Sequence, residues 1–66
     1  MKIVVNGETL AVDSETTLGM IVDGLGRGRA GIAAARNDDV VPRSQWDDEL
    51  LVDGDHIELL TAAQGG

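Results

Sequence analysis

The chain has 66 residues and a formal net charge of −7, from 12 acidic and 5 basic residues. This length predicts one small domain with a thin core, and the acidic surplus argues against binding to nucleic acid or anionic membranes. It favours a partner with a basic surface. The absence of cysteine excludes disulfides, thiol nucleophiles and thiolate metal ligands. The first apolar run, residues 3–5, is too short for a signal peptide or membrane span, so we expect a cytoplasmic protein, monomeric when free.

The first predicted element is a β-hairpin. An apolar run at residues 3–5 and a predicted return strand at residues 9–12 flank the pair Asn6-Gly7. An Asn-Gly pair between apolar runs favours a type I′ turn, because both central residues of that turn need φ > 0. We therefore predict two antiparallel strands joined by a tight turn at Asn6-Gly7.

A helix of about three turns is predicted next. Residues 13–16 are typical of a helix start, with Ser14 or Thr16 as the cap. The apolar side chains that follow share one helical face, and they are Leu18, Ile21, Val22 and Leu25. Gly24 and Gly26 are predicted to end the helix.

Three further strands are predicted, at residues 31–36, 40–41 and 56–61. Pro42 ends the second of them or places it at a sheet edge. Residues 44–49 are expected to form one loose turn around Trp46, and residues 53–55 a tight turn. The order β-β-α-β-β-β predicts an α+β domain in which the helix packs on one face of a mixed sheet.

The alternation of strand residues and the helical period give a predicted core. Its members are Ile3, Val5, Leu18, Ile21, Val22, Leu25, Ile57 and Leu59. The same alternation turns Val4 and Leu60 to the opposite face of the sheet. If the first and last strands pair, Val4 and Leu60 lie close together and form a candidate partner interface. The alternative is that both are scattered surface aliphatics, which are common.

Several motifs match patterns of active or binding sites, but their sequence context does not support such a function. Residues 26–31 match the dinucleotide pattern G-x-G-x-x-G, but they follow a helix and precede a strand, the reverse of a phosphate site. We expect a flexible basic loop there. His56, the only histidine, adjoins a turn and has no Ser or Cys poised beside it, so a surface position is predicted.

Acidic clusters and the single aromatic side chain have equally plain interpretations. The acidic clusters at residues 38–39, 47–49 and 53–55 lack EF-hand spacing, and solvated caps and loops are expected. Trp46 is a possible interface anchor, but in a core without Phe or Tyr it is predicted to cover the core edge. These residues define no catalytic or metal site, so the chain is predicted to be a substrate or carrier and not an enzyme.

The sequence ends in Gln64-Gly65-Gly66, two residues after the predicted last strand. We expect residues 1–61 to form the domain and residues 62–66 a flexible tail. Glycine allows close backbone approach, so such a tail suits a narrow active-site channel in which the Gly66 carboxylate is activated as an acyl-adenylate. The alternative is a frayed chain end without function.

The whole chain resembles the thiamine-biosynthesis sulfur carriers, the ThiS family of ubiquitin-like β-grasp proteins. The segments that carry the resemblance are Asn37 with Val41-Pro42-Arg43, Ser44-Gln45-Trp46, Asp53-Gly54-Asp55 and residues 61–66. One departure is residues 33–36, Ala-Ala-Ala-Arg, which are smaller and less apolar than this resemblance leads us to expect. The resemblance implies a β-grasp fold.

The resemblance also implies a mechanism. A ThiF-type adenylating enzyme activates Gly66 with ATP and Mg²⁺, a sulfurtransferase or cysteine desulfurase system supplies sulfur, and thiazole synthase receives it from the Gly66 thiocarboxylate. The carrier itself then needs no cofactor. Two alternatives remain open, namely a carrier of the same fold for molybdopterin or cysteine synthesis, and a ubiquitin-like protein modifier.

Overall fold

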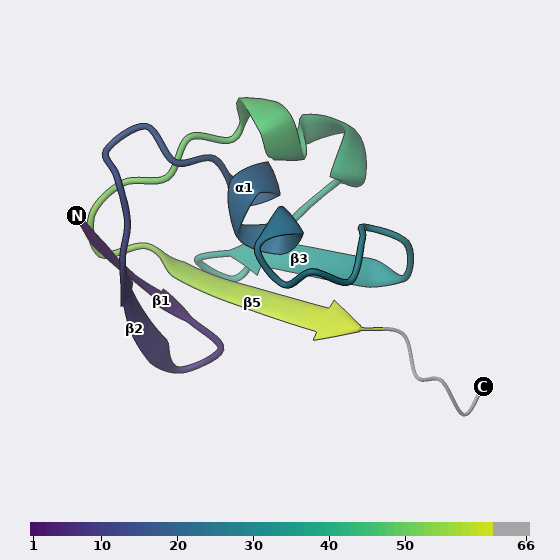
Figure 1. The fold of residues 1–66 in the computed structure, drawn as a ribbon, viewed down its shortest axis with the longest axis horizontal. Coiled ribbons are helices and arrows are strands. Elements are labelled where there is room, and N and C mark those ends of the chain that lie inside the picture. Colours follow the sequence, from purple (N-terminus) through teal and green to yellow (C-terminus); the bar gives the residue numbers. More distant parts are fainter. Residues whose placement is uncertain (62–66) are drawn as a thin grey trace.

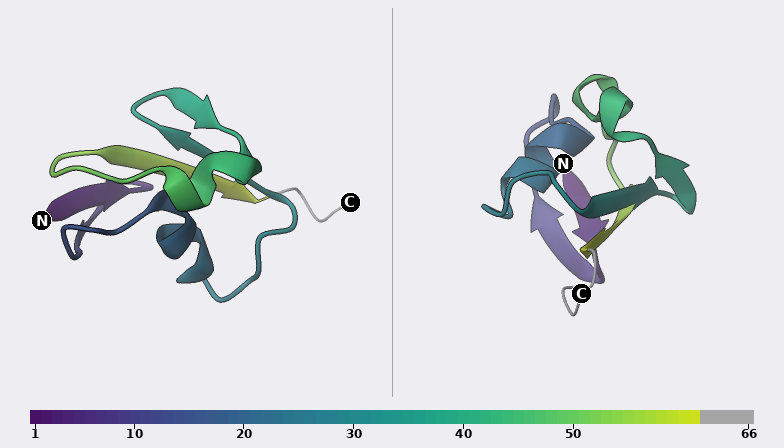
Figure 2. Two further views of the ribbon diagram at one scale, coloured as in Figure 1. Left: turned by 90° about the horizontal axis from the view of Figure 1, so that it is seen from above. Right: turned by 90° about the vertical axis from the view of Figure 1, so that its right-hand side faces the viewer.

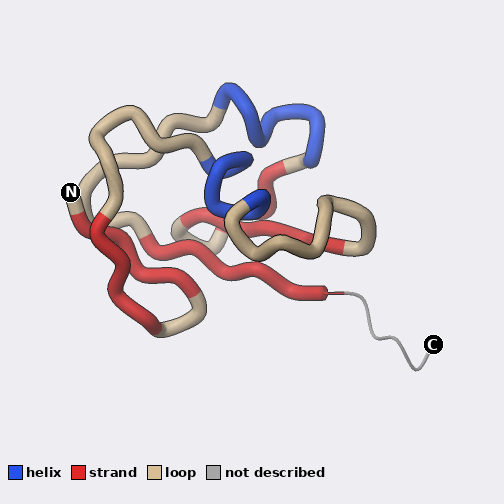
Figure 3. Tube along the Cα trace, viewed as in Figure 1, coloured by secondary structure: helices blue, strands red, loops and turns tan. Residues whose placement is uncertain are grey.

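The computed structural model describes residues 1–61, which form seven short elements (Figure 1). They are β1 Lys2–Val5, β2 Glu8–Ala11, α1 Leu18–Asp23, β3 Ile32–Arg36, β4 Asp39–Val41, the 3₁₀ helix η1 Arg43–Asp48 and β5 His56–Thr61. The helical segments are brief; longer loops connect α1 to β2 and β3, whereas only Pro42 separates η1 from β4 (Figure 3). Within residues 1–61, no helix has the length and apolar character needed to cross a bilayer.

The five strands form one mixed sheet in the order β2-β1-β5-β3-β4. β1 and β5 run parallel, and the other neighbouring pairs are antiparallel. α1 and η1 pack together against one face of the sheet, and the opposite face carries no helix from the described residues (Figure 2). We call that opposite face the outer face. The predicted α+β architecture, with a mixed sheet covered on one side, is confirmed.

Two tight turns connect the outer hairpins of the sheet. Asn6 has φ = 50° and Gly7 has φ = 86°, so the predicted turn with two left-handed residues is confirmed. The β3–β4 hairpin is built the same way, with Asn37 at φ = 51° and Asp38 at φ = 75°. Asparagine is one of the few residues besides glycine that tolerate this region, because its short amide forms local hydrogen bonds. Each turn therefore begins with an asparagine in a left-handed conformation.

The helix is shorter than predicted and begins later. Its N-cap is Thr17, whose hydroxyl accepts a hydrogen bond from the Met20 N–H at 3.2 Å, so neither Ser14 nor Thr16 caps it. The physical reason lies in the segment after η1. Leu18 N–H donates to the Glu49 carbonyl, and the Thr16 carbonyl accepts from Leu51 N–H, and these bonds keep the backbone extended up to Thr17. Only the following residues can then coil.

The core lies between the sheet and the two helices. Most predicted core positions are confirmed as buried, namely Ile3, Val5, Leu18, Val22, Ile57 and Leu59. Ile21 is partly buried. The prediction that Leu25 belongs to the core is wrong, because Leu25 follows the end of α1 and is 41% exposed. Trp46 was predicted at the core edge but is only 1% exposed, and its indole N–H donates to the Val41 carbonyl at 2.8 Å. It is the largest fully buried side chain.

Candidate functional site

Thr61 is the last described residue and precedes the predicted C-terminal tail, so we call it the tail root. It lies beside β3. β5 ends at Thr61, and the register pairs Leu60 with Ala33 and Thr61 with Ile32. The strand carries the chain out past the end of β1 (Figure 1). The candidate residues Gln64, Gly65 and Gly66, together with the predicted tail at residues 62–66, lie outside the described residues, so their predicted roles stay predictions.

An apolar patch lies on the outer face next to the end of β5. We define it by Leu60, Val40, Ala33 and Ala35. Leu60 is 67% exposed and Val40 is 77% exposed. The register sets Leu60 opposite Ala33, and Ala35 between Glu58 and Val40, around a shallow hollow of about 70 Å³. The small alanines of β3 therefore leave both large aliphatic side chains accessible.

The alanine run of β3 divides between the two faces of the sheet. Ala34 is buried in the core, whereas Ala33 is exposed and Ala35 is half-buried on the outer face. Only one of these small side chains thus lies in the core. The departure noted in the sequence therefore changes mainly the outer face and the apolar patch.

Val4 does not join this patch, contrary to the prediction. The parallel register of β1 and β5 places Val4 beside His56. Leu60 lies further along β5, about 13 Å away at roughly 3.3 Å per residue. The alternation of side chains identified the correct face, but it contains no information about the register of a parallel pair. The role of Val4 and Leu60 in a partner interface stays a prediction, but the two residues would contact a partner at separate positions.

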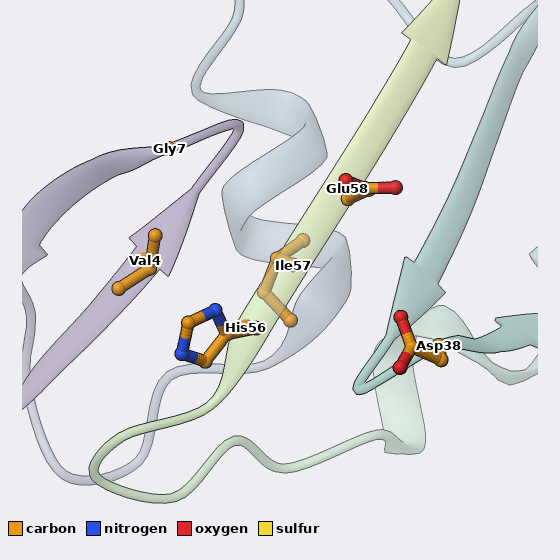
Figure 4. A pocket seen from close by; sticks show the side chains of 6 residues that line it. All are labelled: Val4, Gly7, Asp38, His56, Ile57 and Glu58. Carbon is orange, nitrogen blue, oxygen red and sulfur yellow. The ribbon is translucent and has the colours of Figure 1, made fainter.

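A larger hollow, of about 410 Å³, lies on the outer face between β1 and the β3–β4 turn (Figure 4). Its lining residues are Val4, Gly7, Asp38, His56, Ile57 and Glu58. His56 is exposed, as predicted. Among residues 1–61, no three His, Asp or Glu side chains are arranged to hold a metal ion. The acidic side chains at its rim suit a basic partner surface.

A polar network holds the start of β5. Asp55 is 3% exposed, and its carboxylate accepts hydrogen bonds from Arg36 Nε at 2.8 Å, Asn37 Nδ2 at 3.0 Å and Val52 N–H at 2.8 Å. Arg36 also pairs with Glu49 at 2.8 Å. Burial raises the pKa of Asp55, but the hydrogen bonds from Val52, Asn37 and Arg36 outweigh it and the net pKa is lowered. Asp55 is thus a structural carboxylate and not the solvated loop residue predicted.

The glycine-rich loop connects α1 to β3, as predicted, and one of its two arginines, Arg29, is anchored by carboxylates. Arg29 donates to the Asp23 carboxylate at 2.8 and 2.9 Å and to the Asp47 carboxylate at 3.2 and 2.7 Å. Its guanidinium also lies 5.7 Å from the centre of the Trp46 ring. The hydrogen bonds from Arg29 lower the pKa of both carboxyl groups. Gly19 lies beneath this cluster, where a Cβ would collide with Asp47 and Arg29 side-chain atoms.

The mixed five-stranded sheet, covered on one face by α1 and η1, defines a small ubiquitin-like β-grasp protein. A crystal structure of the thiamine biosynthesis protein ThiS from Geobacter metallireducens matches it with a TM-score of 0.80 and 28% identity, over all of both chains. SAMP1 from Haloferax volcanii matches with a TM-score of 0.63 and 19% identity, over 98% of this chain and 97% of that one. This second likeness shows the fold alone.

Sequence comparisons narrow this class to one family. Residues 2–66 match the sequence profile of the ThiS family. The sulfur carrier protein ThiS of Escherichia coli strain K12 is 33% identical over 66 residues, all of both chains. A thiazole synthase of Paramagnetospirillum magneticum is 32% identical over 66 residues, which are all of this chain but 20% of that protein. The chain belongs to the ThiS family, whose members are small sulfur carriers, and this assignment confirms that it is not an enzyme.

Proposed function

We propose that this chain carries sulfur for thiamine biosynthesis as a thiocarboxylate on Gly66. It works in the cytoplasm and is a monomer when free. The observation that carries the proposal is the match to the ThiS family, which is continuous to residue 66 and therefore includes Gly65-Gly66. The thiazole synthase that contains a segment similar to this chain supports that enzyme as the sulfur acceptor.

The chemistry proceeds in three steps. A carboxylate oxygen of Gly66 attacks the α-phosphorus of ATP on a ThiF-type enzyme, and pyrophosphate leaves with Mg²⁺. A persulfide sulfur from a sulfurtransferase or cysteine desulfurase system then attacks the acyl carbon and AMP leaves, and a second thiol cleaves the S–S bond of the resulting acyl disulfide, so that the Gly66 thiocarboxylate and a disulfide of the two thiols are formed. Thiazole synthase finally receives the sulfur. The nucleotide and the metal belong to the adenylating enzyme, so the carrier supplies only a narrow chain end and a docking surface.

A mass spectrum of the protein after reaction tests this function. We expect incubation with a ThiF-type enzyme, ATP and a sulfur donor to exchange one oxygen of Gly66 for sulfur in the free protein. Addition of thiazole synthase and its small-molecule substrates should then return the carboxylate. Conjugates to lysine without any sulfur-containing species would instead identify a protein modifier. A thiocarboxylate that only molybdopterin or cysteine synthesis enzymes discharge would identify another sulfur carrier.

The apolar patch is proposed as the docking surface for these partners. Replacing Leu60 by Asp should weaken binding to both the adenylating enzyme and thiazole synthase by about tenfold or more, because a charge would enter an apolar contact. Stability should change little, since Leu60 is 67% exposed. Titration of each partner by isothermal calorimetry measures the effect.

Leu50→Asp is a matched control for this substitution. Leu50 is 55% exposed and lies between η1 and β5, where its backbone bridges to Thr17 ahead of α1. The substitution adds the same charge at a distance from the tail root. Equal weakening by Leu50→Asp and Leu60→Asp would assign the effect to net charge, and unchanged binding of Leu60→Asp would remove the patch from the docking surface.

A further inference from the structure

The side chain of Asn6 completes the ladder between β1 and β5. The Asn6 N–H donates to the Ile57 carbonyl at 2.9 Å, which is the last backbone bond on this side. Beyond it, the Leu59 N–H donates to Asn6 Oδ1 at 2.9 Å, and Asn6 Nδ2 donates to the Leu59 carbonyl at 3.2 Å. One carboxamide therefore satisfies both backbone polar groups of Leu59.

The chemistry explains why asparagine fits this position. The chain reverses at Asn6-Gly7, so β1 has no peptide group left to face Leu59. A carboxamide presents the same donor and acceptor as a peptide group, and it can replace the missing one. Asparagine also tolerates the φ of 50° that the turn requires. An Asp would lack the donor, and a Gln would be one methylene too long.

The asparagine of the second hairpin makes a related pair of bonds at the other end of β5, with its backbone N–H as the donor. Asn37, at φ = 51°, donates its N–H to the His56 carbonyl at 2.8 Å, and its Oδ1 accepts the His56 N–H at 2.9 Å. The two turn asparagines thus hold opposite ends of one strand. Asn37 holds the start of β5, whereas Asn6 holds Leu59, which lies two residues before the last described residue.

We propose that Asn6 is a positioning residue for the C-terminal tail. With its amide in place, β5 is held from both sides up to Leu59; without it, only β3 would hold the strand beyond Ile57. The chain would then leave the domain in a range of directions, and a smaller fraction of molecules would present Gly66 to the adenylating enzyme correctly. This inference rests on the proposed function of Gly66.

The substitution Asn6→Gly tests the proposal, with Asn37→Gly as its control. Glycine adopts φ > 0 freely, so the turn should persist in each variant, while the side-chain amide of the replaced asparagine is lost. In the free protein of Asn6→Gly, we expect the hydrogen-exchange rate of the Leu59 N–H to rise about tenfold. The exchange rate of the Leu60 N–H serves as the internal reference. This group faces β3 and not Asn6, because successive N–H groups of a strand alternate in direction. NMR of the free protein measures this without any partner.

The functional readout is the rate of pyrophosphate release with the adenylating enzyme, separated into kcat and KM. For Asn6→Gly we expect kcat/KM to fall about tenfold, more than any loss of melting temperature explains. Asn37→Gly should retain wild-type kcat/KM, although it loses as much melting temperature or more because it also breaks a bond to Asp55.

The outcomes separate this proposal from the function on which it rests. Unchanged exchange at Leu59, unchanged kcat/KM in Asn6→Gly, or an equal loss of kcat/KM in Asn37→Gly would each overturn the positioning role. Failure of the wild-type protein to be adenylated would overturn the proposed function, and this result is seen before any variant is compared.

Discussion

Deletion of Gly66 is expected to abolish thiocarboxylate formation while the free energy of unfolding stays unchanged. The truncated chain still ends in a carboxylate, on Gly65, but this group lies about 3.5 Å short of its former reach, and adenylation requires contact with the α-phosphorus. Stability should be preserved because the buried core of the described residues 1–61 extends from Ile3 to Leu59, several positions before Gly66 in the sequence. Mass spectrometry after reaction with the adenylating enzyme, together with urea denaturation, measures both parts.

Gly66→Ala is the matched control for the length of the chain end. It keeps the chain length and the carboxylate but adds a Cβ, so a channel built for a bare backbone should accept it more slowly and not refuse it. A graded result, with activity lowest for the deletion, would assign the loss to distance. Thiocarboxylate formation by the truncated protein at the wild-type rate would contradict the assignment of Gly66 as the reactive residue.

Features with a strong local cause could be predicted from the sequence. Asn6-Gly7 fixes its turn through the φ > 0 requirement, and the structure has that turn. The alternation of residues 56–61 predicted both the extent of β5 and the burial of Ile57 and Leu59. These features depend on residues close together in the chain, so they need no knowledge of tertiary contacts.

Features with distant partners could not be predicted in this way. The start of α1 is set by bonds between residues 16–18 and 49–51, far apart in the sequence, and these override the local cap signals. Leu25 continues the helical period, yet the helix has already ended before it. The same limit applies to the site, because the parallel register separates Val4 from Leu60, and the bonds from Asn6 to Leu59 span 53 positions.

Trp46→Ala is expected to be the most destabilising single substitution in the described residues. Trp46 is 1% exposed and packs in a core whose other members are aliphatic. Truncating a buried Trp costs about 3–5 kcal/mol through lost burial and the cavity left behind. A domain of this size has a total stability of roughly 3–10 kcal/mol, so the variant should be largely or wholly unfolded at 37 °C. Far-ultraviolet circular dichroism in urea measures the loss, since the substitution removes the only aromatic fluorophore.

Trp46→Phe separates the volume of the side chain from its hydrogen bond. Phenylalanine retains most of the apolar bulk and a ring near Arg29, but it cannot donate to the Val41 carbonyl, as the indole N–H does at 2.8 Å. The expected cost is about 1–3 kcal/mol, from the unpaired carbonyl and a smaller cavity. The folded variant should still be adenylated at Gly66, because Trp46 belongs to η1, which covers the opposite face of the sheet from the apolar patch. A loss of adenylation in a fully folded Trp46→Phe protein would show that Trp46 also influences partner docking, and an unchanged urea midpoint for Trp46→Ala would show that the core does not depend on it.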